Sequence, residues 1–425
     1  MSSLQINTAL LQGARNVVHE LLKFEHPADA VLSYYFRNNR EVGARDRAFI
    51  AETAYAVLRR LRTLERVVAA SGERVTPQRL VLVSLTRIAG YNTRQLAGAL
   101  DPDEVKWLDS LREIKLEPGT LAEQADLPDW LAERLAALMP EADALALARG
   151  MNQPAPLDLR INPVKTTREA VLRQFAAEGI EAEACPYAPL GIRLKKKPSL
   201  ARHPLFLDGS FEVQDEGSQL LGHLLQPKRG EMVMDFCAGA GGKTLLLGAL
   251  MRSSGRLYAF DVSDKRLAKL KPRLARSGLS NVHPGVIASE NDQKVKRLAG
   301  KFDRVLVDAP CSGLGTLRRN PDMKWRQTPE AIAELQQKQT AILASASRLV
   351  KPGGRLVYAT CSILPEENVA IVDAFLAAHP DFARKSAAAV LSQQNVQLDT
   401  GEDLRLLPHV HGTDGFYAAV LERRA

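Results

Sequence analysis

Residues 1 to about 140 carry apolar side chains at the three- and four-residue spacing of amphipathic helices. The spacing is clearest over Ala9–Leu22, Ala48–Leu64 and Gln78–Ile88, and polar turns separate these segments. This part of the sequence shows neither the alternation of a strand nor a cluster of catalytic side chains. We therefore expect a small helical bundle that ends between Pro140 and the prolines of Gln153–Pro156.

From Leu157 onward, short apolar runs alternate with amphipathic segments. A small α+β segment comes first, with strands over Leu157–Ile161 and Gly191–Leu194 and a helix over Thr167–Glu178. After Asp215 the alternation is regular, which predicts an α/β domain with a doubly wound, mostly parallel sheet. Its strands are expected over Glu231–Cys237, Arg256–Asp261, Asp303–Asp308, Gly354–Thr360 and Phe416–Glu422. One helix is expected to begin near Lys243, and a second, after the strand Arg256–Asp261, is expected to end at Arg276. Two more are expected over Pro329–Leu349 and Glu366–Ala378.

These patterns divide the chain into a helical domain (1–145), a small α+β subdomain (155–214) and the α/β domain (215–425). Apolar content of 45% and charged content of 25% exclude a disordered or fibrous protein. No apolar run approaches the ~18 residues of a membrane span. Four cysteines without metal-type spacing favour a reducing cytoplasm and predict no metal site. The net charge of +8 comes from the part after residue 150, where a polyanion such as RNA is expected to bind.

A glycine-rich loop, Asp235–Thr244, leaves one predicted strand and opens a helix. Glycines let the backbone approach a ligand, and the helix N-terminus offers free N–H donors. Asp261 ends the next strand, where an acid accepts hydrogen bonds from ribose hydroxyls. Three ligand classes are compatible with such a site: a nucleoside triphosphate, a dinucleotide and S-adenosylmethionine.

The spacing within the loop separates these ligand classes. Gly242–Lys243–Thr244 suggests a triphosphate, but Cys237 stands where a phosphate loop requires glycine. The loop reads G-x-G-G, whereas dinucleotide sites read G-x-G-x-x-G. S-adenosylmethionine fits best, because it needs its ribose and amino-acid groups anchored but no phosphate cradle.

Two cysteines follow the ends of two predicted strands, in Asp308–Ser312 and Thr360–Ser362. If the strands are neighbours, their ends lie ~5 Å apart and both thiols face one crevice. A thiolate that adds to carbon 6 of a pyrimidine makes carbon 5 able to attack a methyl sulfonium. A second group must then remove the proton from carbon 5, and Asp308 is placed to stabilise the addition. A lone buried cysteine is usually a packing residue, but this pair above a cofactor loop indicates chemistry.

These segments, together with the run Arg318–Trp325, resemble the RNA cytosine-5 methyltransferases of the Sun/Fmu and nucleolar-protein group. The likeness extends from about Phe211 to the C-terminus. The helical N-terminal part resembles the NusB-like RNA-binding domain of the bacterial small-subunit rRNA member. The resemblance implies a Rossmann-like class I methyltransferase fold, S-adenosylmethionine as cofactor, and RNA as substrate, with small-subunit rRNA favoured. We also expect the protein to be a cytoplasmic monomer.

The resemblance also implies roles for individual residues. Cys361 would be the nucleophile that adds to carbon 6, Cys311 would assist release of the methylated base, and Asp308 would lie between cofactor and cytosine. Residues expected to contact the RNA backbone or stack on a base are Arg318, Arg319, Lys324 and Trp325. Residues expected to line the cofactor site are Cys237, Ala238, Gly239, Ala240, Gly241, Gly242, Lys243, Asp261 and Asp308.

Two departures from the family pattern affect the cofactor site. The family loop reads Cys-Ala-Ala-Pro-Gly-Gly-Lys, whereas Gly239–Ala240 replaces Ala-Pro here, which is expected to loosen the loop. A Gly-Asp that holds the adenine amine has no clear counterpart, and Ser289, Glu290 and Asp292 lie near its position. Two other functions are less consistent with the sequence. An RNA-stimulated P-loop ATPase would need glycine where Cys237 stands. A non-catalytic RNA-binding factor has little need for two thiols.

Overall fold

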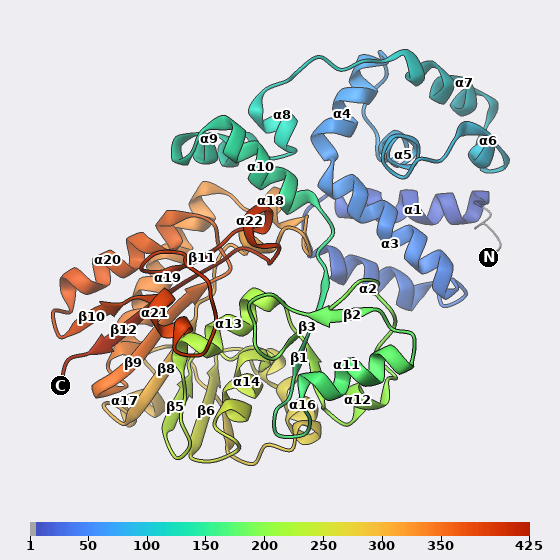
Figure 1. Ribbon diagram of the computed structural model, residues 1–425. Coiled ribbons are helices and arrows are strands. Elements are labelled where there is room, and N and C mark those ends of the chain that lie inside the picture. The colour runs from blue at the N-terminus through green and yellow to red at the C-terminus, as the bar shows by residue number, and fades with distance from the viewer. Residues whose placement is uncertain (1–5) are drawn as a thin grey trace. The chain divides into compact units, whose positions relative to one another are not determined.

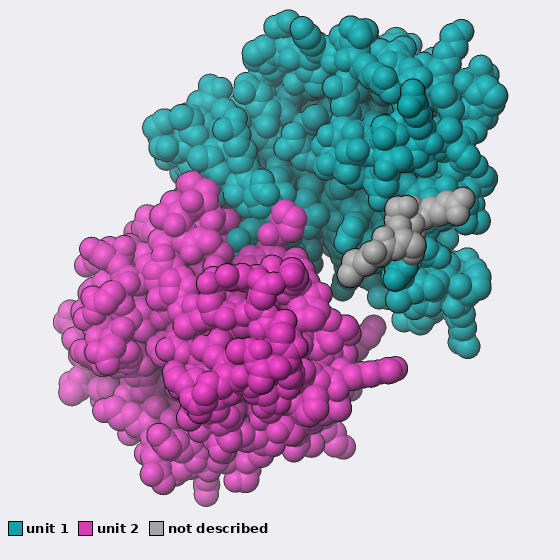
Figure 2. Space-filling view, turned by 45° about the vertical axis from the view of Figure 1, so that its right-hand side comes forward, with its two compact units in different colours: residues 1–153, 317–329 teal, residues 154–316, 330–425 magenta. Residues whose placement is uncertain are grey.

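The computed structural model describes residues 6–425, which form two compact units (Figures 1 and 2). Unit 1 comprises the chain up to Gln153 together with the segment Leu317–Pro329. Unit 2 comprises Pro154–Thr316 and Glu330–Ala425. The chain therefore leaves unit 2 after Thr316, contributes a short segment to unit 1, and returns at Glu330. None of the helices within residues 6–425 has the length and apolar character needed to cross a membrane.

Unit 1 is helical, as its apolar spacing predicts. The expected single helix over Ala48–Leu64 is wrong, because Arg60 leaves helical geometry and separates α3 from α4. Asp126 explains the break: its carboxylate accepts hydrogen bonds from the backbone N and the hydroxyl of Thr63, both at 2.9 Å, and so caps α4. The helices are α1 Thr8–Leu21, α2 Ala28–Asn38, α3 Ala44–Arg59, α4 Leu61–Ala70, α5 Pro77–Val83, α6 Thr93–Leu96, α7 Pro102–Ser110, α8 Leu121–Ala125, α9 Asp129–Leu138, α10 Glu141–Asn152 and α18 Met323–Arg326.

Unit 2 begins with a small antiparallel sheet of order β2-β3-β1-β4. The strands β1 and β3 have the expected bounds, and the apolar pattern did not reveal the two three-residue strands. Helix α11 packs on this sheet through Val171 and Phe175. The elements are β1 Leu157–Ile161, α11 Arg168–Ala177, β2 Ala182–Ala184, β3 Gly191–Leu194, α12 Pro204–Leu207 and β4 Phe211–Val213.

The large sheet of unit 2 has the order β10-β12-β9-β8-β5-β6-β7, and β11 pairs with β12. The strands from β9 to β7 are parallel, and β12 and β10 are antiparallel additions at one edge. This arrangement confirms the predicted α/β class with a mostly parallel sheet. The strands are β5 Met232–Asp235, β6 Arg256–Asp261, β7 Val282–Val286, β8 Phe302–Asp308, β9 Val350–Thr360, β10 Phe382–Lys385, β11 Leu404–Leu406 and β12 Phe416–Arg423.

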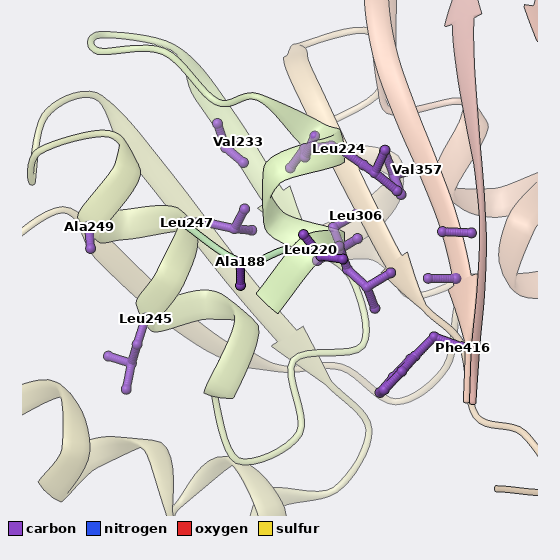
Figure 3. Packing of buried hydrophobic residues seen from close by; sticks show 14 of the residues in the cluster. Ala188, Leu220, Leu224, Val233, Leu245, Leu247, Ala249, Leu306, Val357 and Phe416 are labelled. Atoms are coloured by element: carbon purple, nitrogen blue, oxygen red, sulfur yellow. The ribbon is translucent and has the colours of Figure 1, made fainter. Parts of the chain in front are cut away.

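Helices cover both faces of the large sheet, so the inner strands are apolar on both sides. On one face, α13 and α14 pack on side chains such as Val233 and Leu306 (Figure 3). On the other face, α19 and α20 pack on side chains such as Met234 and Val305. The helices of this domain are α13 Glu216–Leu225, α14 Gly242–Leu250, α15 Asp264–Leu267, α16 Leu270–Ser277, α17 Gln293–Lys296, α19 Pro329–Ser347, α20 Val369–Ala378, α21 Ala387–Ser392 and α22 Pro408–His411.

Candidate active site

The two cysteines lie beyond the carboxyl ends of neighbouring parallel strands. In the ladder between β8 and β9, Asp308 pairs with Ala359, so Cys311 and Cys361 follow at nearly the same level. Their Sγ atoms are 3.3 Å apart. The two loops are also joined through the backbone, because Gly315 N donates to the carbonyl of Cys361 at 2.8 Å. The structure therefore brings both thiols into one place.

The environment of Cys311 raises the pKa of its thiol. The hydrogen bond with Cys361, together with burial, holds the pKa of Cys311 well above its usual range. Cys311 is thus favoured as the protonated thiol, within hydrogen-bond distance of the Cys361 sulfur. Sulfur is a nucleophile in its thiolate form, and a neighbouring thiol is a suitable hydrogen-bond donor to such a group.

The glycine loop between β5 and α14 forms a turn with two left-handed residues. Gly241 has φ +81°, and a Cβ there would lie 2.2 Å from a methyl carbon of Leu270, so this position requires glycine. Gly239 has φ +55° and open space where a Cβ would be. The loop therefore presents bare backbone beside the free N–H groups of α14, which fits a ligand held by close backbone contact.

Asp261 closes the loop against the end of β6. It is 2% exposed, and its carboxylate accepts from Gly239 N at 2.8 Å, Ser263 N at 2.7 Å and the Arg266 guanidinium at 3.0 Å. A carboxylate has about four acceptor positions, so about one remains for a ribose hydroxyl. Asp261 fixes the loop in addition to any ligand contact.

Lys243 connects the loop to Asp308 at the end of β8. Its Nζ lies 2.6 Å from Asp308 Oδ2. Burial opposes the charge on this ammonium, but the neighbouring Asp308 outweighs it and raises the pKa of Lys243. Deeper in the site, burial raises the pKa of Asp235 to about 7, although the hydrogen bond from Thr244 lowers it. The ion pair places a fixed positive and a fixed negative charge between the cofactor loop and the cysteines.

Two arginines hold carbonyls of the glycine loop, and the sequence analysis did not identify either of them. Arg273 donates to Ala240 O at 2.7 Å, and Arg160 donates to Gly242 O at 2.6 Å. Glu212 fixes Arg273 with two hydrogen bonds of 2.8 and 3.0 Å. The basic character of residues 265–276 was the only sequence signal for Arg273. These contacts restrain the loop at the position where the family has proline.

The run expected to contact RNA belongs to unit 1. Lys324 is completely buried, and its Nζ donates to Arg59 O at 3.0 Å and Asn152 Oδ1 at 2.9 Å. Burial lowers the pKa of Lys324 to about 7. Trp325 donates from Nε1 to Leu58 O at 2.8 Å. The expected contact of Lys324 with RNA is therefore wrong, because this buried side chain joins three parts of the helical unit.

The two arginines at the start of this run differ in exposure. Arg318 is 5% exposed, and its carbonyl accepts from Arg59 at 3.0 Å. Arg319 is half-buried and retains exposed surface. An RNA contact by Arg319 stays a prediction, whereas Arg318 offers little surface for one.

The residues near the expected adenine contact also have defined positions. Asp292 begins α17, and its carboxylate accepts from Ala288 N and Lys294 N, both at 2.8 Å. This carboxylate therefore caps a helix. The Ser289 hydroxyl accepts from Asn291 N at 3.2 Å and lies closer to the end of β7 along the chain.

The chain is similar to a family of methyltransferases along most of its length. Residues 222–422 match the family described as 16S rRNA methyltransferase RsmB/F, and residues 127–201 match the ferredoxin-like domain of RsmF/B-like methyltransferases. A Synechocystis protein named probable ribosomal RNA small subunit methyltransferase B is 35% identical over 410 residues, covering 89% of this chain and 91% of its own. A protein of Sodalis glossinidius named ribosomal RNA small subunit methyltransferase B is 35% identical over 399 residues, covering 88% and 89%.

Solved structures agree with this relationship. The crystal structure named PH0851 has a TM-score of 0.80 and 27% identity, and covers 99% of this chain and all of its own. A methyltransferase homologue from Pyrococcus horikoshii has a TM-score of 0.61 and 30% identity, and covers 72% of this chain and all of its own. The Rossmann-like methyltransferase fold and S-adenosylmethionine as cofactor are thereby confirmed, and the bare backbone at Gly239 fits that cofactor. The chain belongs to the RsmB/F family of rRNA methyltransferases.

Proposed function

We propose that this protein methylates carbon 5 of a cytosine in RNA, through a temporary bond between Cys361 and the base. Small-subunit rRNA is the favoured substrate, because the names of the relatives refer to it. The observation that carries the proposal is the 3.3 Å separation of the Cys311 and Cys361 sulfurs beside the glycine loop. S-adenosylmethionine supplies an electrophilic methyl group at this site. The cytosine must leave its stack to reach the sulfurs.

The first step is attack by the Cys361 thiolate on carbon 6 of the cytosine. A bond forms between Sγ and carbon 6, and the electron pair of the carbon 5–carbon 6 bond becomes available at carbon 5. Asp308 is paired with Lys243, so its carboxylate is suited to accept a hydrogen bond from the exocyclic amine. This contact would orient the ring while carbon 5 takes the methyl group.

The second step removes the proton from carbon 5 and releases Cys361. The hydrogen bond to Cys361 is the largest cause of the raised pKa of Cys311. Once Cys361 is bonded to carbon 6, its sulfur is neutral and a weak acceptor, so this cause disappears. Cys311 can then lose its proton to water, and its thiolate accepts the carbon 5 proton. The electron pair of the carbon 5–hydrogen bond re-forms the carbon 5–carbon 6 double bond, the carbon 6–sulfur bond breaks, and Cys361 leaves as a thiolate.

The proposal is tested by replacing each cysteine in turn. Cys361→Ala is expected to abolish transfer of labelled methyl groups to RNA while S-adenosylmethionine still binds. Cys311→Ala is expected to accumulate a covalent protein–RNA adduct, visible as a slow band on a denaturing gel. Cys185→Ala changes a buried thiol directly after β2 in the small sheet of unit 2. It is the matched control and should turn over normally. Full activity of Cys361→Ala would refute the covalent mechanism.

The substrate is tested separately. Bisulfite sequencing of total RNA from a strain lacking this protein should show one or more unmodified cytosines in small-subunit rRNA. Loss of modification in tRNA alone would contradict the rRNA assignment and leave the chemistry intact.

A further inference from the structure

A buried glutamate lies between the two cysteine loops and has no part in the mechanism above. Each cysteine is followed by a serine, Ser312 and Ser362, and both serines are at most 2% exposed. Glu367 is completely buried. Its Oε1 accepts from Ser312 N at 2.8 Å, and its Oε2 accepts from the hydroxyls of both serines. One carboxylate thus binds the residue after each cysteine.

Other side chains hold Glu367 in place. Gln339 on α19 donates from Nε2 to Glu367 Oε1 and to Pro310 O, both at 3.0 Å. The Tyr358 hydroxyl donates to the carbonyl of Glu367 at 2.7 Å. An ionised carboxylate only accepts hydrogen bonds, which matches the donors gathered around it. Buried polar groups of this kind are costly to leave unsatisfied, so the cluster favours a single geometry.

The position of this cluster matters because regular strand pairing stops before the cysteines. The β8–β9 ladder ends at Asp308 and Ala359, and the chain continues as loops on both sides. The separation of the two sulfurs therefore depends on contacts between the loops. Effective group transfer requires reacting atoms to be held to within a fraction of an ångström.

We propose that Glu367 is a positioning residue that keeps Cys311 and Cys361 at reacting distance. Its effect on turnover rests on the proposed function, whereas its effect on the sulfur separation does not. Loss of the carboxylate should let the two loops move apart. Binding of RNA and of S-adenosylmethionine should change little, since Glu367 is completely buried beneath the loops.

The first experiment measures the proximity of the two sulfurs without RNA. Diamide oxidises two neighbouring thiols to a disulfide and is itself reduced to a hydrazine, so the rate of Cys311–Cys361 disulfide formation reports their separation. Glu367→Gln keeps the shape of the side chain but turns an NH₂ group toward hydrogen-bond donors. The disulfide, quantified by mass spectrometry of digested protein, should form at least ~10-fold more slowly than in the wild type.

The second experiment measures turnover. Glu367→Gln should lower kcat at least ~10-fold and leave KM for RNA and for S-adenosylmethionine within ~2-fold. Asp126→Asn is the matched control: it makes the same carboxylate-to-amide change at a completely buried residue of unit 1 that also accepts from a backbone N and a hydroxyl. It should lower the melting temperature without changing kcat.

Ser362→Ala removes one hydroxyl donor and serves as the milder variant if Glu367→Gln does not fold. It should slow both disulfide formation and turnover, by less than the glutamate change. Wild-type disulfide rates in whichever of these variants folds would overturn the positioning role. Slow disulfide formation in Glu367→Gln combined with full methylation by Cys361→Ala would instead refute the proposed chemistry and leave the positioning role standing.

Discussion

Replacement of Lys324 by methionine should change how the stability of unit 1 depends on pH. Lys324 is completely buried, and burial lowers its pKa from 10.5 to about 7. The folded state therefore favours the neutral amine, whose two N–H groups match the two acceptors Arg59 O and Asn152 Oδ1. Between pH 7 and 10.5 the unfolded state binds more protons than the folded state. Stability therefore rises with pH across this window, and the full cost is present below pH 7.

The size of the effect follows from the two pKa values of Lys324. The lowered pKa of this amine reduces the free energy of unfolding by ~4 kcal/mol at pH 7 and by ~2 kcal/mol at pH 9. Methionine removes this cost but also two hydrogen bonds, worth ~1 kcal/mol each. Lys324→Met should thus stabilise unit 1 by ~2 kcal/mol at pH 7 and have an effect of ~0 kcal/mol at pH 9.

Tryptophan fluorescence measures this effect in unit 1 alone. All three tryptophans of the chain, Trp107, Trp130 and Trp325, belong to that unit. Urea unfolding followed by fluorescence at several pH values should give a rising stability curve for the wild type and a flatter one for Lys324→Met. Curves that run parallel from pH 7 to 9 would show that Lys324 is charged in the folded protein, and the reasoning from burial would fail.

Two further predictions concern the cofactor loop. Arg273→Ala should weaken S-adenosylmethionine binding ~10-fold, because a charged hydrogen bond to the loop is lost. Arg276→Ala removes hydrogen bonds to Glu212 instead and should weaken binding less; calorimetric titration measures both. Gly241→Ala should abolish cofactor binding and lower the melting temperature, because its Cβ would collide with Leu270. Gly239→Ala should cost only ~1 kcal/mol of backbone strain, because the space around it is open. Equal effects of the two variants would contradict this difference in space.

Much of the large sheet could be predicted because its strands are local, apolar and followed by recognisable loops. Parallel strands end at one edge, so the order of Asp235, Asp308 and Thr360 at strand ends was enough to expect a shared site. The edge strand β7 was missed because Val282–Val286 contains His283 and Pro284 and lacks an apolar run. In this sheet it pairs as a parallel edge strand with β6.

The residues that hold the site together could not be predicted, because their partners are distant in the sequence. Glu367 follows Ser362 by five positions but lies 55 positions from Ser312. Arg273 lies 33 positions from Ala240. No periodicity or local motif connects such pairs. Burial of Lys324 was equally hidden, since a charged residue in a four-residue helix has no apolar pattern around it.

The discontinuity of unit 1 has a consequence for protein synthesis. Gln153 leaves the ribosome long before Leu317, and at ~5–20 residues per second the delay is roughly 8–30 s. During that interval the nascent helical bundle lacks the partners that Trp325 and Lys324 later provide to Leu58 and Arg59. The apolar surface of the bundle against which Trp325 packs stays uncovered during this time. Maturation of the bundle therefore waits until translation has passed Pro329.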